Sequence, residues 1–287
     1  FSLGTRGNNW YSVQIDTLGY RGQTTIALDS NNQAHISYYD SSNNELKYSN
    51  FDGNKWSIDF IDPAGGYGAY PSIAIDNLNQ PHMSYYGNGD LKYAYLKWME
   101  WQTEMVDFVG DVGYHTSLAL DSDNHPHISY YDNSNTDLKY AYHDGAEWQT
   151  EIVDSQGIVG SYTSIALDSQ DLPHISYFDY TNYDLKYAFF DGSRWHNQTL
   201  DSNGNVGRYT SLAVDSNDRP HISYVDYSYS DLKYTAYDGT NWQTETVDLQ
   251  GPHDAYTSIA LDSNDRPHIS YHDNSNRDLK YAMYFRS

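Results

Sequence analysis

The stretch Thr210-Ser-Leu-Ala-Val-Asp-Ser-Asn-Asp-Arg-Pro-His-Ile-Ser-Tyr224 decides the fold, because the chain contains it six times with small changes. Its core, His-Ile-Ser-Tyr or His-Met-Ser-Tyr, begins at six histidines that are 47, 45, 47, 47 and 47 residues apart: His35, His82, His127, His174, His221 and His268. Self-similarity with a period of about 40 to 50 residues indicates a repeat architecture, in which each unit is one small supersecondary structure.

Each unit is predicted to contain four short β-strands. In the third unit the first strand is Thr116–Asp121, the second begins at His127, the third begins at Leu138 and the fourth begins at Trp148. These segments alternate apolar and polar residues and are rich in β-branched and aromatic types, as half-buried strands are. Turn residues such as Asp144-Gly145 separate them and predict tight hairpins. No segment has helical periodicity, so we expect essentially no helix.

Six units of four antiparallel strands predict an all-β, six-bladed β-propeller that forms a single domain. The last unit ends after its third strand, whereas an isolated strand around Trp10 precedes the first unit. We expect this strand to complete the sixth blade beside Leu279–Phe285 and close the ring, because free sheet edges promote aggregation. The closing strand is placed at residues 1–17, and the six blades are placed at 18–62, 63–107, 108–154, 155–201, 202–248 and 249–287.

Composition excludes several classes of function. The 287 residues include 39 Asp and Glu against 16 Lys and Arg, a net charge of −23, which argues against binding to nucleic acid or to an anionic membrane surface. No apolar run approaches the roughly 18 residues of a membrane-spanning helix. Cysteine is absent, so disulfides and thiolate chemistry are excluded. We interpret the chain, which starts at Phe1, as a mature extracellular or periplasmic protein, and we expect a monomer.

The residues that recur in every unit are interpreted as structural. Six equal histidines spread around a ring cannot converge on one metal, and a catalytic triad needs one special place. We therefore expect each His, and the Ser two positions later, to be buried and to bond the backbone or an Asp within its blade. A Lys recurs two positions after an acidic residue, and we expect a weak ion pair at the strand edge. These lysines are Lys47, Lys92, Lys139, Lys186, Lys233 and Lys280.

The Asp-rich loops, such as Asp121-Ser-Asp-Asn124, favour hairpin turns over metal binding, since they lack the Gly and Glu of an EF-hand loop. A looser calcium site stays open as an alternative, and no cofactor is required.

Two positions differ between units and are predicted to lie on one face of the ring. The residue that enters the first strand is expected near the axis: Gln23, Tyr70, His115, Tyr162, Tyr209 and Tyr256. The residue after the repeated core is Tyr39, Tyr86, Tyr131, Phe178, Val225 or His272, followed in five units by Asp. Arg21 and Arg208 lie in neighbouring loops. Aromatic faces beside carboxylates suit sugars, so these residues form the predicted ligand-binding set. The alternative is that the Tyr side chains pack between blades.

The chain resembles propellers built from sialidase-like (BNR-type) repeats and, more loosely, the propeller lectins. Tyr237–Trp242 partly matches the Asp-box of such repeats. A sialidase would need three converging arginines, and only Arg21 and Arg208 are expected on the correct face, which argues against that activity. Similarity to propeller polysaccharide lyases implies a His/Tyr pair with an Arg. His115, Tyr70 and Tyr162, with Arg21 or Arg208, are the matching catalytic candidates.

These observations favour a secreted, non-enzymatic, lectin-like propeller that binds a glycan or another neutral small ligand through the Tyr- and Asp-rich loop face. Repetition would then give several similar sites and avidity. One alternative is a polysaccharide lyase or glycoside hydrolase with a single site at the axial mouth. The other is a protein-interaction scaffold.

Overall fold

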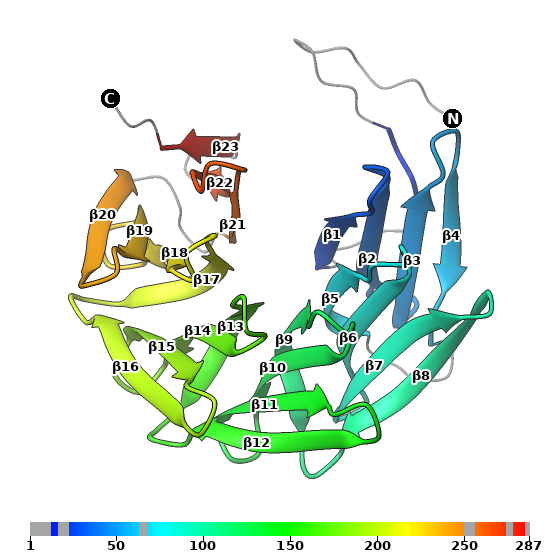
Figure 1. Cartoon of the computed structure of the whole chain (residues 1–287), viewed down its shortest axis with the longest axis horizontal. Coiled ribbons are helices and arrows are strands. Elements are labelled where there is room, and N and C mark those ends of the chain that lie inside the picture. The colour runs from blue at the N-terminus through cyan, green and yellow to red at the C-terminus, as the bar shows by residue number, and fades with distance from the viewer. Residues whose placement is uncertain (1–12, 17–22, 63–67, 250–255, 274–277, 285–287) are drawn as a thin grey trace.

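The computed structural model describes residues 13–16, 23–62, 68–249, 256–273 and 278–284. These residues form 23 β-strands in six antiparallel sheets (Figure 1) and contain no α-helix, hence none that could cross a bilayer. Their core lies between neighbouring sheets. The strands of the first three sheets are β1 (Thr24–Leu28), β2 (Ala34–Asp40), β3 (Glu45–Phe51) and β4 (Trp56–Phe60), then β5 (Ala69–Ile75), β6 (Pro81–Gly87), β7 (Asp90–Lys97) and β8 (Glu100–Asp107), then β9 (Val112–Leu120), β10 (Pro126–Asp132), β11 (Asp137–His143) and β12 (Trp148–Asp154). The strands of the last three are β13 (Val159–Leu167), β14 (Pro173–Asp179), β15 (Asp184–Phe190) and β16 (Trp195–Asp201), then β17 (Val206–Val214), β18 (Pro220–Asp226), β19 (Asp231–Tyr237) and β20 (Trp242–Asp248), then β21 (Thr257–Leu261), β22 (Pro267–Asp273) and β23 (Asp278–Met283).

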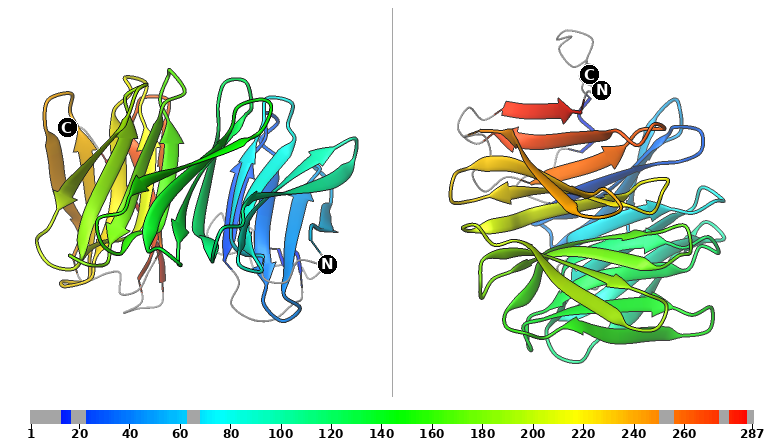
Figure 2. Two further views of the ribbon diagram at one scale, coloured as in Figure 1. Left: turned by 90° about the horizontal axis from the view of Figure 1, so that it is seen from below. Right: turned by 60° about the vertical axis from the view of Figure 1, so that its left-hand side comes forward.

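The six sheets are the blades of a propeller. Figure 1 shows the first strands β1, β5, β9, β13, β17 and β21 around the centre, with the fourth strands of blades 1 to 5 outermost. The predicted six-bladed, all-β fold is confirmed, with four strands in five blades and three described strands in the last. Connections gather at two opposite ends of the ring (Figure 2). The repeat face carries the links between first and second and between third and fourth strands. The variable face carries the remaining links.

Apolar side chains from the third strand of one blade pack against the first two strands of the next. Leu138 and Tyr140 of blade 3 meet Ile165, Ile175 and Tyr177 of blade 4, and all five are buried. Similar clusters fill the other described seams, including the one formed by blades 5 and 6. Because burial of apolar area drives folding, each blade depends on its neighbour for most of its core.

Each of these seams also contains a hydrogen-bonded cluster of an Asp, a Tyr and a Lys, which we call the Asp–Tyr–Lys cluster. Asp107, the last residue of β8, accepts hydrogen bonds from Tyr130 Oη at 2.7 Å and from Lys139 Nζ, both in the next blade. Asp62, Asp154, Asp201 and Asp248 make the same pair of contacts. The expected pair with the acidic residue two positions earlier is found for Lys47, which lies 3.9 Å from Glu45, and is wrong for the other five lysines as the main contact. They lie on the sheet face that packs against the preceding blade, which supplies one carboxylate, and the Asp that ends the second strand of their own blade supplies another in some blades, as Asp273 does for Lys280 at 2.9 Å.

The first blade has the same Asp–Tyr–Lys cluster, in which the Asp comes from the N-terminal segment. Asp16 accepts hydrogen bonds from Tyr38 Oη at 2.8 Å and from Lys47 Nζ at 3.4 Å. Asp16 thus lies where the fourth strand of a preceding blade would end. Trp10 and most of the predicted closing strand fall outside the described residues, so ring closure by that strand stays a prediction. In the described part, Ile26 of blade 1 and Leu279 of blade 6 are 64% and 81% exposed, whereas their counterparts in other seams are buried.

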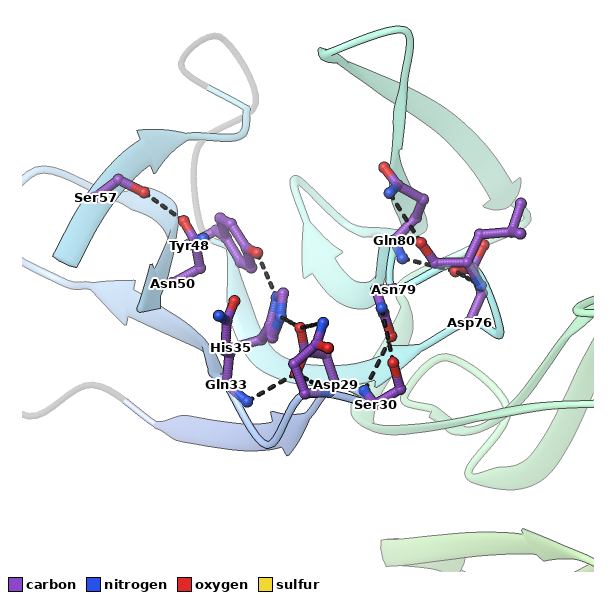
Figure 3. Close-up of polar contacts among 12 residues, drawn as sticks. Asp29, Ser30, Gln33, His35, Tyr48, Asn50, Ser57, Asp76, Asn79 and Gln80 are labelled. Atoms are coloured by element: carbon purple, nitrogen blue, oxygen red, sulfur yellow. Dashed lines mark hydrogen bonds and ion pairs between the residues drawn. The ribbon is translucent and has the colours of Figure 1, made fainter. Parts of the chain in front are cut away.

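The loops of the repeat face explain the recurring Asp, Ser and His. Asp29 Oδ1 accepts the backbone N–H groups of Asn31 and Gln33 and so forms the turn (Figure 3). Ser30 N–H then donates to Asn79 Oδ1 of the next blade at 2.9 Å. The corresponding links 77–124, 122–171, 169–218 and 216–265 join the later blades.

The recurring histidines are structural, as expected, but the sequence did not reveal their main partner. His35 Nδ1 shares a hydrogen bond with Tyr48 Oη on the third strand of the same blade, 2.5 Å away (Figure 3). Its Nε2 lies 3.8 Å from Asp29 Oδ2. Burial lowers the pKa of His35 and keeps the imidazole neutral. The recurring Ser of blades 2 to 5 bonds a Thr across the seam instead, as Ser129 Oγ accepts from Thr163 Oγ1 at 2.8 Å, whereas Ser37 bonds Thr25 within its own blade.

Candidate functional site

The residues that enter the first strands form a ring around the axis. Neighbouring ring centroids are 4.5 Å apart for Tyr70–His115, 4.6 Å for His115–Tyr162, 4.4 Å for Tyr162–Tyr209 and 4.7 Å for Tyr209–Tyr256. Gln23 joins the ends, since its Nε2 donates to Tyr256 Oη at 3.1 Å and its Oε1 accepts from Tyr70 N–H at 2.8 Å. The structure therefore brings together all six predicted axial residues. Their part in ligand binding stays a prediction.

An unusual backbone turns these aromatic residues toward one another. Tyr70, His115, Tyr162 and Tyr209 have φ between 53° and 55°, a region that costs energy for residues with a Cβ. Two positions before Tyr209, Gly207 has φ of 97°, and a Cβ on it would lie 2.5 Å from the Cα of Leu185 in the preceding blade. This close contact of a Gly with a Leu of the preceding blade recurs in blades 2 to 5. The residue between the Gly and the aromatic residue lies at the end of the first strand that borders the variable face.

The chemistry of His115 follows from this packing. Burial between Tyr70 and Tyr162 lowers the pKa of His115 to about 4, so the ring is neutral near pH 7 and is a weak base. Burial also raises the pKa of both tyrosines. The three catalytic candidates lie next to one another around the axis, with the His115 ring tilted by 54° to that of Tyr70 and by 52° to that of Tyr162. Catalysis by them stays a prediction, and Arg21 lies outside the described residues.

The residues after the repeated core are less accessible than expected. Tyr131, Phe178 and Val225 are buried, Tyr39 and Tyr86 are half-buried, and His272 is exposed. The neighbouring carboxylates are buried as well: Asp40, Asp132, Asp179, Asp226 and Asp273. Asp132 Oδ1, for example, accepts the N–H groups of Ser134 and Asn135, each at 3.0 Å. The expectation of a carboxylate-lined rim is therefore wrong, because these carboxylates hold the loop turns.

One seam of the variable face carries a cation among aromatic rings. The guanidinium carbon of Arg208 lies 4.5 Å from the ring centroid of Tyr227, 5.3 Å from that of Phe178 and 5.7 Å from that of Tyr180. Arg208 Nε donates to Asn205 Oδ1 at 3.3 Å. We call Arg208, Phe178, Tyr180 and Tyr227 the Arg208 cluster. Cation–π contacts of this kind orient a guanidinium and stabilise it by about 0.5–2 kcal/mol each.

Further tyrosine surface adjoins the Arg208 cluster. Tyr180 and Tyr183 are each 43% exposed, and their ring centroids are 5.7 Å apart. Sequence reasoning identified Arg208 and Phe178 but missed Tyr180, Tyr183 and Tyr227. A signal existed, because Tyr180-Thr-Asn-Tyr183 and Tyr227-Ser-Tyr229 replace the Asn-Ser-Asn found in this loop of the third and sixth units.

The other seams differ at the position of Arg208. It is occupied by Ala69, Tyr114 and Ser161 in blades 2, 3 and 4. Tyr114 Oη lies 3.3 Å from Asp111 Oδ2 and 3.2 Å from Tyr86 Oη, either of which can accept its proton, so this hydroxyl is satisfied within the protein. Among the seams that the structure describes, only the one between blades 4 and 5 presents a cation at this position.

The repeat face has a pocket of about 460 Å³ between blades 5 and 6, which includes Arg219, Tyr234, Glu245 and Arg266. Tyr234 and Glu245 correspond to residues that hold a tryptophan at other seams. Tyr140, for instance, lies 5.2 Å from the ring of Trp195, whose Nε1 donates to Glu151 at 2.8 Å. The pocket therefore corresponds to the position of an outer-strand Trp, and we do not propose it as a ligand site.

Metal binding gains no support from the described residues, in which no group of three or more His, Asp or Glu side chains is placed to hold an ion. The Asp-rich loop at Asp121 uses Oδ1 to accept the N–H groups of Asp123 and His125. Calcium binding stays a prediction.

No family model and no curated protein matches the chain, but many solved structures do. AofleA from Arthrobotrys oligospora aligns with a TM-score of 0.66 and 10% identity over 94% of this chain and 84% of its own. A fungal lectin from Aleuria aurantia, described as a six-bladed β-propeller with a novel mode of fucose recognition, aligns with a TM-score of 0.61 and 10% identity over 91% and 90%. A polysaccharide lyase, an ulvan lyase, aligns with a TM-score of 0.62 and 12% identity over 89% and 78%. At such identities the likeness shows the shared propeller fold.

Proposed function

We propose that the chain is a carbohydrate-binding propeller and that the Arg208 cluster, with Tyr183 beside it, is its principal binding surface. The observation that carries the proposal is the guanidinium held within 6 Å of three aromatic rings on the variable face, one of which, Tyr180, is exposed and packs against the exposed Tyr183. Tyrosine rings offer apolar faces that stack on sugars and hydroxyls that pair with sugar hydroxyls. Among the structural neighbours, a lectin of this fold recognises fucose, which supports the proposal by analogy of fold.

One principal site replaces the several similar sites that the repeats suggested. The framework between blades recurs, but the residue at the Arg208 position changes at every described seam. Avidity through equal sites would require equal residues. We propose secretion with this function, since extracellular glycans are the natural ligands of such a surface.

The lyase alternative receives no specific support from the described residues. His115 is packed between two rings, and Arg194, Arg219 and Arg266 belong to loops of the repeat face. The described arginines therefore form no converging set of three on the variable face. Three converging arginines are what a sialidase would need, so sialidase activity gains no support from the described residues either.

The test is a glycan array followed by calorimetry on the whole chain. Tyr180→Ala should weaken binding of the best glycan by about 10-fold or more, since loss of an aromatic platform costs about 1–3 kcal/mol. Tyr284→Ala removes a comparably exposed tyrosine, 44% against 43%, from the other end of the ring and is the matched control. The proposal fails if no glycan binds, or if both variants bind as the wild type does.

A further inference from the structure

The chemistry around Arg208 identifies a class of ligand. The chain has 39 acidic residues against 16 basic ones, so a carboxylate partner is available to most cations. Arg194 lies 3.9 Å from Asp191, and Arg266 lies 2.6 Å from Asp262. Arg208 is half-buried and forms no ion pair with any carboxylate of the described chain. Holding a partly desolvated cation without an anion costs free energy unless a ligand supplies one.

The hydrogen-bonding capacity of Arg208 is largely unused. A guanidinium has five N–H donors, and here Nε donates to Asn205 Oδ1. The donors on the two terminal nitrogens have no acceptor among the described residues. The aromatic rings of the cluster contact the guanidinium by cation–π attraction, which leaves these donors free to meet a ligand.

The two terminal nitrogens form a fork that matches a carboxylate or a sulfate group. Such groups accept two parallel N–H bonds from an arginine, which gives strength and orientation together. The ring of Tyr180 is 5.7 Å from the guanidinium carbon and 5.7 Å from the ring of Tyr183, and both side chains are 43% exposed, so they suit the sugar ring that carries the acid group. A neutral sugar would pair with fewer of these donors and would leave the positive charge uncompensated.

We infer that the ligand of the Arg208 cluster is an acidic sugar, whose carboxylate or sulfate group is bound by the terminal nitrogens of Arg208. This inference rests on the proposed function and narrows it, and it replaces the neutral ligand expected from the sequence. Since Ala69, Tyr114 and Ser161 occupy the corresponding positions in blades 2, 3 and 4, we assign one such site to the seams that the structure describes.

The experiment compares acidic glycans with their own neutralised forms. Oligosaccharides that contain uronic acids are arrayed beside carboxyl-reduced counterparts, and sulfated oligosaccharides beside desulfated counterparts. The wild-type chain should prefer one acidic member to its neutral counterpart by about 10- to 100-fold, as expected for hydrogen bonds to a charged group. Which of the two pairs shows the difference distinguishes a carboxylate from a sulfate.

Variants then assign the preference to Arg208. Arg208→Gln should remove the discrimination, and Arg208→Lys should retain part of it, because Lys keeps the charge but loses the fork. Arg194→Gln makes the same change of charge on the repeat face, where the side chain is 75% exposed, and should bind as the wild type does. Thermal midpoints show whether each variant is folded, and the Lys variant keeps the test decisive if the Gln variant is not.

The outcomes separate the two levels of the proposal. Equal binding of acidic and neutralised glycans, or discrimination that survives in Arg208→Gln, overturns the acidic-sugar inference and leaves carbohydrate binding standing. Absence of binding to every glycan, acidic and neutral, overturns both.

Discussion

The two faces of the propeller differ in what their residues do. On the repeat face, the same turn and the same link between neighbouring loops recur at five seams, as with Ser169 and Asp218. Near the variable face, a repeated Asp–Tyr–Lys cluster lies beneath residues that change from blade to blade. Among the described seams, one carries the Arg208 cluster. Repetition therefore marks the contacts that hold blades together, and departure from it marks the candidate site.

The largest expected effect tests the framework beneath the variable face. Asp107→Ala should lower the free energy of unfolding by about 3 kcal/mol, because the buried Tyr130 would lose its acceptor and the partly buried Lys139 would keep only Asp132, 4.0 Å away. Chemical denaturation measures the loss. Asp123→Ala, in an exposed loop of the repeat face, should change stability by less than about 0.5 kcal/mol. Similar losses in both variants would contradict the distinction between framework and surface.

The second test concerns Trp10, the residue that we expect to fill the pocket on the repeat face. Trp10 stands six positions before Asp16, the spacing that separates Trp195 from Asp201, and Asp16 makes the contacts of an outer-strand end. We expect Trp10→Ala to destabilise the protein by about 3 kcal/mol, as the loss of a buried Trp does. Trp98→Ala is the control, since that side chain is 87% exposed. Equal thermal midpoints for the two variants would refute closure of the ring by Trp10.

The axial ring gives a smaller, pH-dependent effect. Burial lowers the pKa of His115 to about 4 in the folded chain, whereas an unfolded His has a pKa near 6.5. Between these two pH values, the unfolded chain binds a proton that the folded chain does not bind. The stability contributed by the neutral ring is full above the higher of these two values and is lost as the pH falls toward 4. Between pH 7 and pH 5, the wild type should lose about 2 kcal/mol more than His115→Gln does. A pH-independent gap between the two proteins would show that His115 titrates normally.

The repeats predicted the fold because each carries its own strand, turn and spacing signals, as His127-Ile-Ser-Tyr130 and Asp144-Gly145 do. They also placed Gln23, Tyr70, His115 and the later axial residues together. What the sequence could not give was the partner across a seam. Lys139 lies near Asp137 along the chain, yet it binds Asp107 of the preceding blade. The Arg208 cluster was missed in part for the same reason, since Tyr180 contacts Arg208 from the preceding blade.

The most direct test measures stability and glycan binding together in one variant from each face. Asp218→Ala should lower stability by about 1–2 kcal/mol, because Ser169 loses both its hydrogen bonds, and should leave glycan binding unchanged. Asp218→Asn, which copies the residue found at Asn124, should restore the stability. Tyr180→Ala should weaken glycan binding by about 10-fold and leave stability within about 0.5 kcal/mol. The opposite pattern, in which the Asp218 variant loses binding and the Tyr180 variant loses only stability, would contradict the assignment of the site to the variable face.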